Sequence, residues 1–228
     1  MRRFLADGLP SQDERVTLSS EQSHHLLRVV GIGPDEVVIL LDGKGGSCQA
    51  KIAHIEGGLA TLQFVAAQPP QEQGPELWMC LALTKPPAFS LALRMLTEIG
   101  VAHIVPVITE RSQRRGEKED RWKRILLSAL QQSGRSHMPT LYPLQPLEAA
   151  IRLCEPLVHR YFLHPHTLPL SGQCVSCAAF IGPEGGFSTR EIGVLEHAGW
   201  HGRSLGFSVL RADTAAAVSA GILAQPTS

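Results

Sequence analysis

The sequence predicts an α/β fold: a mostly parallel sheet with helices on both faces, preceded by a small β-rich domain. Residues 1–66 contain short apolar runs separated by glycine turns, a pattern typical of a small β-barrel. From residue 77 onward, apolar strands alternate with helical patterns, which indicates parallel strands joined by helices. Residues 66–76 are rich in proline and glutamine and have no periodicity. The chain is therefore expected to divide into residues 1–70 and 71–228.

The first domain is expected to combine one helix with three strands. Ser19 and Gln22 form a capping-box pattern, so a helix is expected over residues 20–30, and Gly31 is expected to end it. The expected strands, separated by glycine turns, are residues 37–41, 47–55 and 59–65. Strands this closely spaced favour a small barrel.

The second domain is expected to alternate strands and helices along its length. The expected strands are residues 77–83, 103–108 and 157–163, a run that ends at Ile181, and a short run that ends at Gly206. The expected helices are residues 89–99, 121–132 and 147–153, one from Thr189, and one over the alanine-rich C-terminal segment. The capping-box pair Ser188 and Glu191 marks the start of the helix at Thr189.

Two loops that follow apolar strands are the most informative part of the chain. The first, residues 181–187, holds three glycines and a proline, and the second, residues 205–215, begins with Leu205-Gly206. Glycines leave backbone N–H groups uncovered, and ligands of parallel sheets bind beyond the carboxyl ends of the strands. We interpret the two loops as walls of one pocket for a nucleoside-type ligand. Two ordinary strand-to-helix turns remain the alternative.

Composition narrows the class of protein. The 21 basic and 21 acidic residues balance, so no global field favours a nucleic acid, although a local patch would suffice. Five cysteines, an odd number, argue against a secreted disulfide framework. No apolar run reaches the ~20 residues that span a bilayer, and no signal-type core follows Arg2 and Arg3. We expect a soluble, cytoplasmic protein with no membrane partner.

Two further patterns have structural alternatives. Residues 110–137 carry eight Lys or Arg against four acids, which favours either an RNA-backbone contact or a solvated helix face. Cys174 and Cys177 form a CxxC that enters a buried strand, and the scattered remaining cysteines do not complete a zinc set. We interpret this pair as packing residues, and His24 and His25 as helix residues, so no metal is expected.

The two glycine loops resemble motifs of a known family. Gly-Pro-Glu-Gly-Gly-Phe at residues 182–187 and Leu-Gly-x-x-Val-Leu-Arg-x-Asp-Thr-Ala at residues 205–215 are similar to the RsmE family of 16S rRNA uridine N3-methyltransferases, which belong to the SPOUT class. The resemblance covers nearly the whole chain. Its other stretches, in order, are Arg3-Phe4, His25-Leu26-Leu27-Arg28, Leu41 to Gly46, Thr97 to Val101, Glu110-Arg111-Ser112, Arg121-Trp122 and Gln132 to Arg135.

The resemblance implies a deep trefoil knot in the C-terminal domain that holds S-adenosylmethionine. The cofactor-binding residues that it implies are Ile181, Gly182, Pro183, Gly185, Gly186, Leu205, Gly206, Val209 and Leu210. Uracil N3 must lose a proton before it is methylated, so a cation near the base carbonyls would stabilise the resulting charge. Arg211 is our candidate for this catalytic task or for holding phosphate. The alternative is a helix-start arginine paired with Glu184 or Asp213, and Glu184 itself is expected to bind N–H groups of its own loop.

The resemblance also implies partners. The N-terminal domain resembles a PUA-type RNA-binding barrel, and the expected contacts to 16S rRNA or the 30S subunit are Arg3, Arg28, Arg111, Arg114 and Arg135. SPOUT enzymes usually pair two knots, so a homodimer is expected. The chain departs from common family residues at Met95, Ser128, Gln131, Ser208 and Asp213. A knotted methyltransferase acting on another RNA, and a non-catalytic assembly factor with the same fold, are therefore alternatives.

Overall fold

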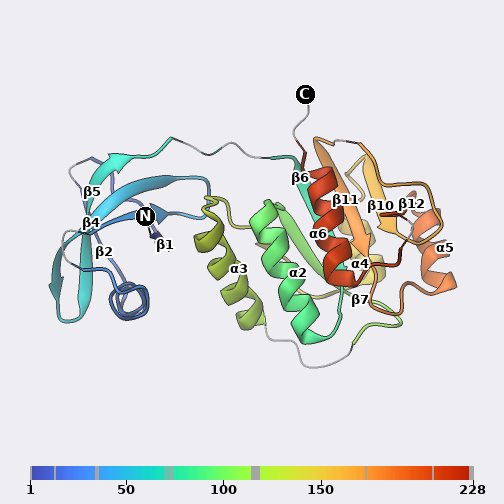
Figure 1. The fold of residues 1–228 in the computed structure, drawn as a ribbon, viewed down its shortest axis with the longest axis horizontal. Helices are drawn as coiled ribbons and strands as arrows, with labels where there is room; N and C mark the ends of the chain where they lie inside the picture. The colour runs from blue at the N-terminus through green and yellow to red at the C-terminus, as the bar shows by residue number, and fades with distance from the viewer. Residues whose placement is uncertain are drawn as a thin grey trace. The chain divides into compact units, whose positions relative to one another are not determined.

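The computed structural model describes residues 2–12, 14–33, 36–69, 71, 74–113, 119–172, 174–206 and 208–225 (Figure 1). Contacts divide the chain into two compact units. One contains Met1–Gln73 with Leu130–Met138, and the other contains Gly74–Ala129 with Pro139–Ser228. The predicted domain boundary at residue 70 lies outside the described residues.

The first unit contains a five-stranded sheet in the order β1-β3-β4-β5-β2. The strands are β1 (Arg3–Leu5), β2 (Arg15–Thr17), β3 (Val37–Leu41), β4 (Ser47–Glu56) and β5 (Leu59–Ala67). β1 pairs with β3 in parallel, and the other pairs are antiparallel. The three predicted strands are confirmed within two residues. β1 and β2 were not predicted, because three residues are too few to show alternation.

The predicted helix of the first unit changes its winding partway. Ser19 and Gln22 form the predicted capping box, and α1 (Ser20–His24) follows it. The chain then continues as the π-helix η1 (His25–Val30), which ends at Gly31 with a left-handed φ of 69°. A left-handed residue after a helix is typical of glycine, so the predicted end is confirmed. The helix packs through Leu26, which is fully buried with Val38 and Leu62 in the core of this unit.

The second unit contains a seven-stranded sheet with the path β12-β10-β11-β6-β7-β8, and β9 pairs beside β8 on β7. Every pairing described in this sheet is parallel, which confirms the predicted class. The strands are β6 (Glu76–Ala82), β7 (His103–Ile108), β8 (Thr140–Leu141), β9 (Gln145–Pro146), β10 (His159–Leu163), β11 (Ser176–Ile181) and β12 (His201–Arg203). The two-residue strands β8 and β9 were not predicted.

Helices cover both faces of the parallel sheet (Figure 1). They are α2 (Pro86–Ile99), α3 (Glu119–Ser133), α4 (Leu147–Leu153), α5 (Thr189–His197) and α6 (Ala212–Leu223). α2 and α6 pack together, and α6 also contacts β6 and β11. α4 and α5 bury Ile151 and Leu195 against Phe180 on the other face. α2 begins at Pro86, three residues before its predicted start, because proline fits the first turn of a helix.

The C-terminal part of the chain brings distant loops together. β11 lies inside the sheet, and its residues from Cys177 to Ile181 are buried. β12 lies at the edge of the sheet, yet α6 returns to pack against β6 and β11. The loop between β12 and α6 therefore crosses from the sheet edge back toward the carboxyl end of β11. This crossing places the two predicted loops side by side.

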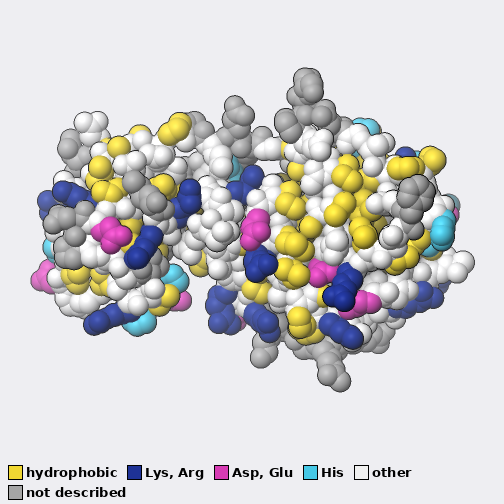
Figure 2. Space-filling view, viewed as in Figure 1, with side chains coloured by type: hydrophobic (Ala, Val, Ile, Leu, Met, Phe, Trp, Pro, Cys, Tyr) yellow, Lys and Arg dark blue, Asp and Glu magenta, His cyan; other side chains and the backbone are white. Residues whose placement is uncertain are grey.

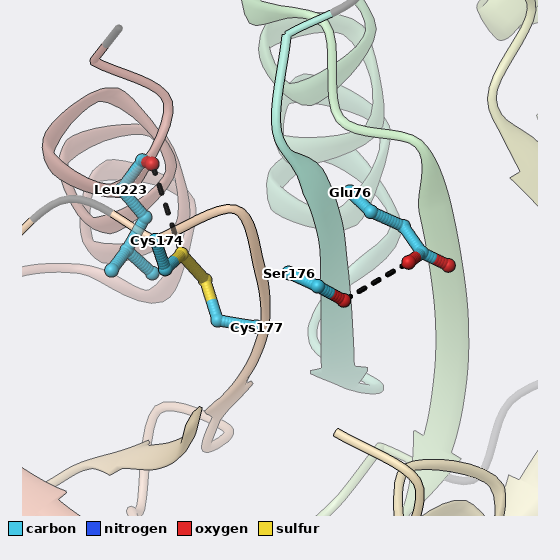
Figure 3. The surroundings of a disulfide bond; sticks show 5 residues. All are labelled: Glu76, Cys174, Ser176, Cys177 and Leu223. Atoms are coloured by element: carbon cyan, nitrogen blue, oxygen red, sulfur yellow. Dashed lines mark hydrogen bonds between the residues drawn. A yellow bond between two sulfur atoms is a disulfide. The ribbon is translucent and has the colours of Figure 1, made fainter. Parts of the chain in front are cut away.

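The CxxC pair differs from our interpretation. Cys174 and Cys177 form a disulfide, with their Cα atoms 6.1 Å apart, whereas we expected two unlinked packing residues (Figure 3). The chain bends just before β11, and this bend brings the Cα atoms within the usual range for a disulfide. Both cysteines are buried, and the Cys174 Sγ lies 4.0 Å from the carbonyl oxygen of Leu223 in α6.

Candidate active site

A cleft of about 340 Å³ opens at the carboxyl ends of β10, β11 and β12. Three loops line it, each together with the last residue of the strand before it: residues 163–165 at β10, residues 181–184 and 186 at β11, and residues 203–206 and 208–212 at β12. The lining is mainly apolar side chains and backbone, with few charged groups. Such a position and character are typical of ligand sites in parallel sheets.

The first glycine loop is a tight turn whose shape depends on its glycines. The Gly186 N–H donates to the Pro183 carbonyl at 2.8 Å, and Gly186 has a left-handed φ of 66°. A Cβ at Gly182 would lie 3.2 Å from the Phe187 ring, so a side chain there would require the ring to shift. The predicted capping box of Ser188 and Glu191 is present and starts α5 immediately after the turn. The turn is therefore held from both sides.

Eight of the nine predicted cofactor-binding residues line the cleft. They are Ile181, Gly182, Pro183, Gly186, Leu205, Gly206, Val209 and Leu210. Gly185 is not among the lining residues, and it lies against the Arg111 side chain instead. A Cβ at Gly185 would be 3.2 Å from the Arg111 Cδ. The assignment of these residues to a cofactor remains a prediction.

Arg211 lies where the cleft meets a second cavity. It is the N-cap residue of α6, is exposed, and lines both the cleft and a neighbouring cavity of about 500 Å³. Its side chain forms no hydrogen bond or ion pair with the described residues. The Glu184 carboxylate accepts from the Lys85 N–H at 3.2 Å, and the Asp213 carboxylate accepts from the Thr214 N–H at 3.0 Å. The pairing of Arg211 with either acid, the alternative to a catalytic role, is therefore not formed, and Glu184 accepts a hydrogen bond from a neighbouring loop rather than from its own.

Sequence reasoning missed the third wall of the cleft. Leu163, the last residue of β10, lines the cleft with His164 and Pro165, which follow it, and with Arg203 at the end of β12. The Arg203 guanidinium lies 5.4 Å from the centre of the Tyr161 ring and donates to the Gly202 carbonyl at 2.8 Å. The signal that could have found this loop is its place after a predicted strand, since it contains no glycine.

The predicted RNA-binding arginines lie in both units. Arg28 is exposed on η1, and Arg3 in β1 packs against Gly134, where a Cβ would lie 2.6 Å from the Arg3 guanidinium carbon. Arg135 is half-buried, and this burial lowers its pKa. Arg111 donates to two carbonyls of the glycine loop. Arg114 lies outside the described residues.

A second group of arginines was only partly anticipated. Arg94 on α2 and Arg121 and Arg124 on α3 line a groove of about 370 Å³, together with Ile125 and Ser128. Figure 2 shows Lys and Arg side chains gathered over α3 and the adjoining part of α2. Arg94 forms an ion pair with Glu98 at 3.7 Å. The groove thus presents three guanidinium groups to solvent.

Among the described residues, no group of three or more His, Cys, Asp or Glu side chains could hold a metal ion. None of the helices within the described ranges is long and apolar enough to cross a membrane.

Comparisons with known proteins agree with the layout of the two units. A family model described as an RNA methyltransferase domain matches residues 71–224, and one described as an RNA methyltransferase PUA domain matches residues 18–65. Ribosomal RNA small subunit methyltransferase E of Synechocystis sp. is 31% identical over 221 residues, which cover 90% of this chain and 71% of that protein. Its counterpart from Mycobacterium tuberculosis is 27% identical, over 99% of this chain and 92% of that protein.

Two similar solved structures contain S-adenosylmethionine. Ribosomal RNA small subunit methyltransferase E of Neisseria gonorrhoeae, bound to S-adenosylmethionine, has a TM-score of 0.87 and 26% identity, over 96% of this chain and 95% of that one. A putative methyltransferase of Legionella pneumophila, in complex with the same cofactor, has a TM-score of 0.85 and 27% identity. That match covers 96% of this chain and 94% of the other.

Proposed function

This chain belongs to the RNA methyltransferase family that includes ribosomal RNA small subunit methyltransferase E, and we propose that it methylates N3 of one uridine in 16S rRNA with S-adenosylmethionine. The observation that carries the proposal is the convergence of three loops, two of them the predicted glycine motifs, on a single cleft. Its volume of about 340 Å³ lies within the usual range for small-molecule sites, roughly 300–1,000 Å³.

The residues of the cleft fit this cofactor. The apolar side chains of Ile181, Leu205 and Leu210 suit an adenine ring, and the exposed backbone of Gly182 and Gly186 can approach a ribose closely. Among the described residues the lining holds two arginines, Arg203 and Arg211, and Arg203 lies over the Tyr161 ring, so few cations are available for a phosphate and a nucleoside is favoured. When bound, S-adenosylmethionine supplies an activated methyl group, so the protein mainly has to align the acceptor nitrogen and exclude water.

Arg211 is the residue to which we assign charge stabilisation. It lies at the border of the cleft and the neighbouring cavity, and its guanidinium forms no ion pair with an acid among the described residues, although Glu184 and Asp213 line the same cavity. A uracil that has lost its N3 proton carries negative charge on its carbonyl oxygens, and a preorganised donor there stabilises the transition state. The acceptor base would enter the cavity that Arg211 shares with Lys85 and Ala88.

RNA contacts are assigned to both domains. Residues 1–70 form a PUA-like RNA-binding domain, and residues 71–228 form the methyltransferase domain. Arg3, Arg28, Arg111, Arg114 and Arg135 bind 16S rRNA, as free rRNA or within the 30S subunit. Each phosphate contact releases counterions, so binding weakens as salt rises.

Three further properties complete the proposal. The return of the chain from edge strand β12 to α6 supports a trefoil knot. Val209 and Val218 are 81% and 39% exposed, and hydrophobic side chains gather over α2 and α6 in Figure 2, which supports a homodimer through this face. The enzyme acts in the cytoplasm, where ribosomal subunits assemble.

The test is nucleoside mass spectrometry of 16S rRNA from a strain that lacks the gene. We expect 3-methyluridine to disappear from 16S rRNA and to return when the gene is restored. An unchanged uridine profile would refute the proposal. Assays on naked 16S rRNA, 30S subunits and tRNA separate it from a methyltransferase of another RNA. Failure to bind S-adenosylmethionine in calorimetry would instead favour an assembly factor.

A further inference from the structure

Hydrogen bonds, some buried and some exposed, join the loop after β7 to the first glycine loop. The loop after β7, residues 109–113, does not line the cleft. It is compact, because the Ser112 Oγ accepts from the Thr109 N–H at 3.0 Å and the Gln113 N–H donates to the Leu83 carbonyl at 3.1 Å. A movement of any part of it is therefore transmitted to the rest.

Glu191 links this loop to the glycine turn through its carboxylate. Its side chain is buried, with 3% of its surface exposed. One carboxylate oxygen accepts from the Ser188 N–H at 2.8 Å, and the other accepts from the Glu110 N–H, also at 2.8 Å. Because a buried carboxylate needs both partners, the two loops hold a fixed relative position.

Arg111 links the same two loops across their surface. Its Nη1 donates to the Gly185 carbonyl at 2.7 Å and to the Phe187 carbonyl at 3.5 Å. Its aliphatic part lies against Gly185, so a side chain at this position, which does not line the cleft, would require Arg111 to shift. Arg190 and Glu110 form a further, exposed ion pair at 3.1 Å, which contributes little to the stability of this arrangement.

The Arg111 guanidinium has N–H groups that these two carbonyls do not use. Arginine carries five N–H groups in a planar fork, and both of these hydrogen bonds use Nη1. Among the described residues, its Nε and Nη2 have no hydrogen-bond acceptor, and the residue is exposed. One edge can therefore hold the cofactor turn while the other binds a phosphate.

We propose that Arg111 and Glu191 are positioning residues that make RNA binding and cofactor binding mutually favourable. A phosphate of the RNA backbone on the free edge of Arg111 orders its guanidinium, and this ordering stabilises the turn that contacts the cofactor. Coupling of this kind is reciprocal, so bound cofactor strengthens RNA binding by the same factor. The inference rests on the proposed function, because it assumes RNA as substrate and the cleft as the cofactor site.

The test measures the affinity for 16S rRNA by filter binding, with and without saturating S-adenosylhomocysteine, at one salt concentration. For the wild type we expect the ligand to tighten RNA binding by about fivefold or more. Arg111→Lys keeps the charge but cannot hold both partners at once, so its affinity for RNA, whatever its value without the ligand, should no longer change when S-adenosylhomocysteine is added. Glu191→Gln can satisfy only one N–H and is too buried to touch RNA, so it should lose the tightening without weakening RNA binding alone. Arg152→Ala, an exposed arginine on α4, is the matched control and should retain both.

A second readout does not depend on RNA or activity. Gly185→Ala alone should weaken S-adenosylhomocysteine binding, because its Cβ would crowd Arg111. In an Arg111→Ala background the same change should have no further effect. The inference is overturned if wild-type RNA affinity does not respond to the ligand, if Arg111→Lys keeps the response, or if the two changes are additive. A wild type that neither binds S-adenosylhomocysteine nor methylates 16S rRNA would instead overturn the proposed function.

Discussion

Replacing Gly186 by alanine tests the glycine turn through its backbone alone. Gly186 has a φ of 66°, and a Cβ added there would meet no atom within 4 Å. The effect of alanine is therefore conformational rather than a clash within the protein. An L-residue in the left-handed region costs about 1–2 kcal/mol. If the turn of the free variant relaxes away from this backbone conformation, cofactor binding must restore the conformation. Cofactor affinity should then fall by about 5–30-fold.

The assay is calorimetric titration with S-adenosylhomocysteine, together with thermal unfolding. Where the folded state keeps the strained turn, the melting temperature should fall by roughly 2–8 °C for a protein of this size. Gly57→Ala is the matched control, because Gly57 has a φ of 55°, has no atom within 4 Å of an added Cβ, and lies in the β4–β5 hairpin. It should lower stability by a similar amount and leave ligand affinity unchanged. Wild-type affinity together with a wild-type melting temperature in Gly186→Ala, or equal losses of affinity in both variants, would refute this reasoning.

Three other predictions concern charge. In a labelled-methyl transfer assay, Arg211→Ala should lower kcat by about 10²–10³ with little change in S-adenosylhomocysteine affinity. Arg211→Lys should recover part of the lost kcat. An unchanged kcat in Arg211→Ala would exclude a catalytic role for Arg211. Burial lowers the pKa of His103, with Glu76 offsetting part of the effect, so the folded protein binds this proton less tightly than the unfolded chain. The contribution of His103 to the free energy of unfolding is therefore full above a pH of about 6.5 and is lost as pH falls. The difference in melting temperature between the wild type and His103→Gln should narrow as pH falls from about 7.5 to 5.5. A difference that stays constant with pH would contradict the assignment. Arg121→Ala should weaken RNA binding and reduce its salt slope by about 0.7–0.9, whereas an unchanged slope would exclude a phosphate contact in the groove.

The sequence predicted the elements whose local signals are strong. Ser188 and Glu191 marked the start of α5 correctly, because a capping box is a local pattern that the fold preserves. β1 and β2 were missed because they form only through pairing with distant strands, which a three-residue segment does not reveal. The disulfide of Cys174 was missed because its formation depends on a bend before β11.

The site was predictable where glycines mark it and not elsewhere. Gly182 and Gly206 identified two walls of the cleft, because glycine has a specific backbone role in turns. His164 on the third wall has no such signature. Arg111 contacts Gly185 across 74 positions of sequence, so its packing on the turn depends on the tertiary fold. Glu191 also accepts a hydrogen bond from the Glu110 N–H. This contact likewise depends on the tertiary fold, so the local capping-box pattern could not reveal it.

The central claim is that this cleft delivers a methyl group to N3 of a uridine in 16S rRNA. It is tested most directly by incubating the purified protein with isotopically labelled S-adenosylmethionine and either 16S rRNA or 30S subunits lacking the modification. Nucleoside mass spectrometry of the digested RNA then identifies the product. We predict labelled 3-methyluridine with the wild type and a strong loss of it with Gly186→Val, a variant expected to remain folded by circular dichroism. Absence of label from every uridine, or label on another nucleoside, would contradict the account.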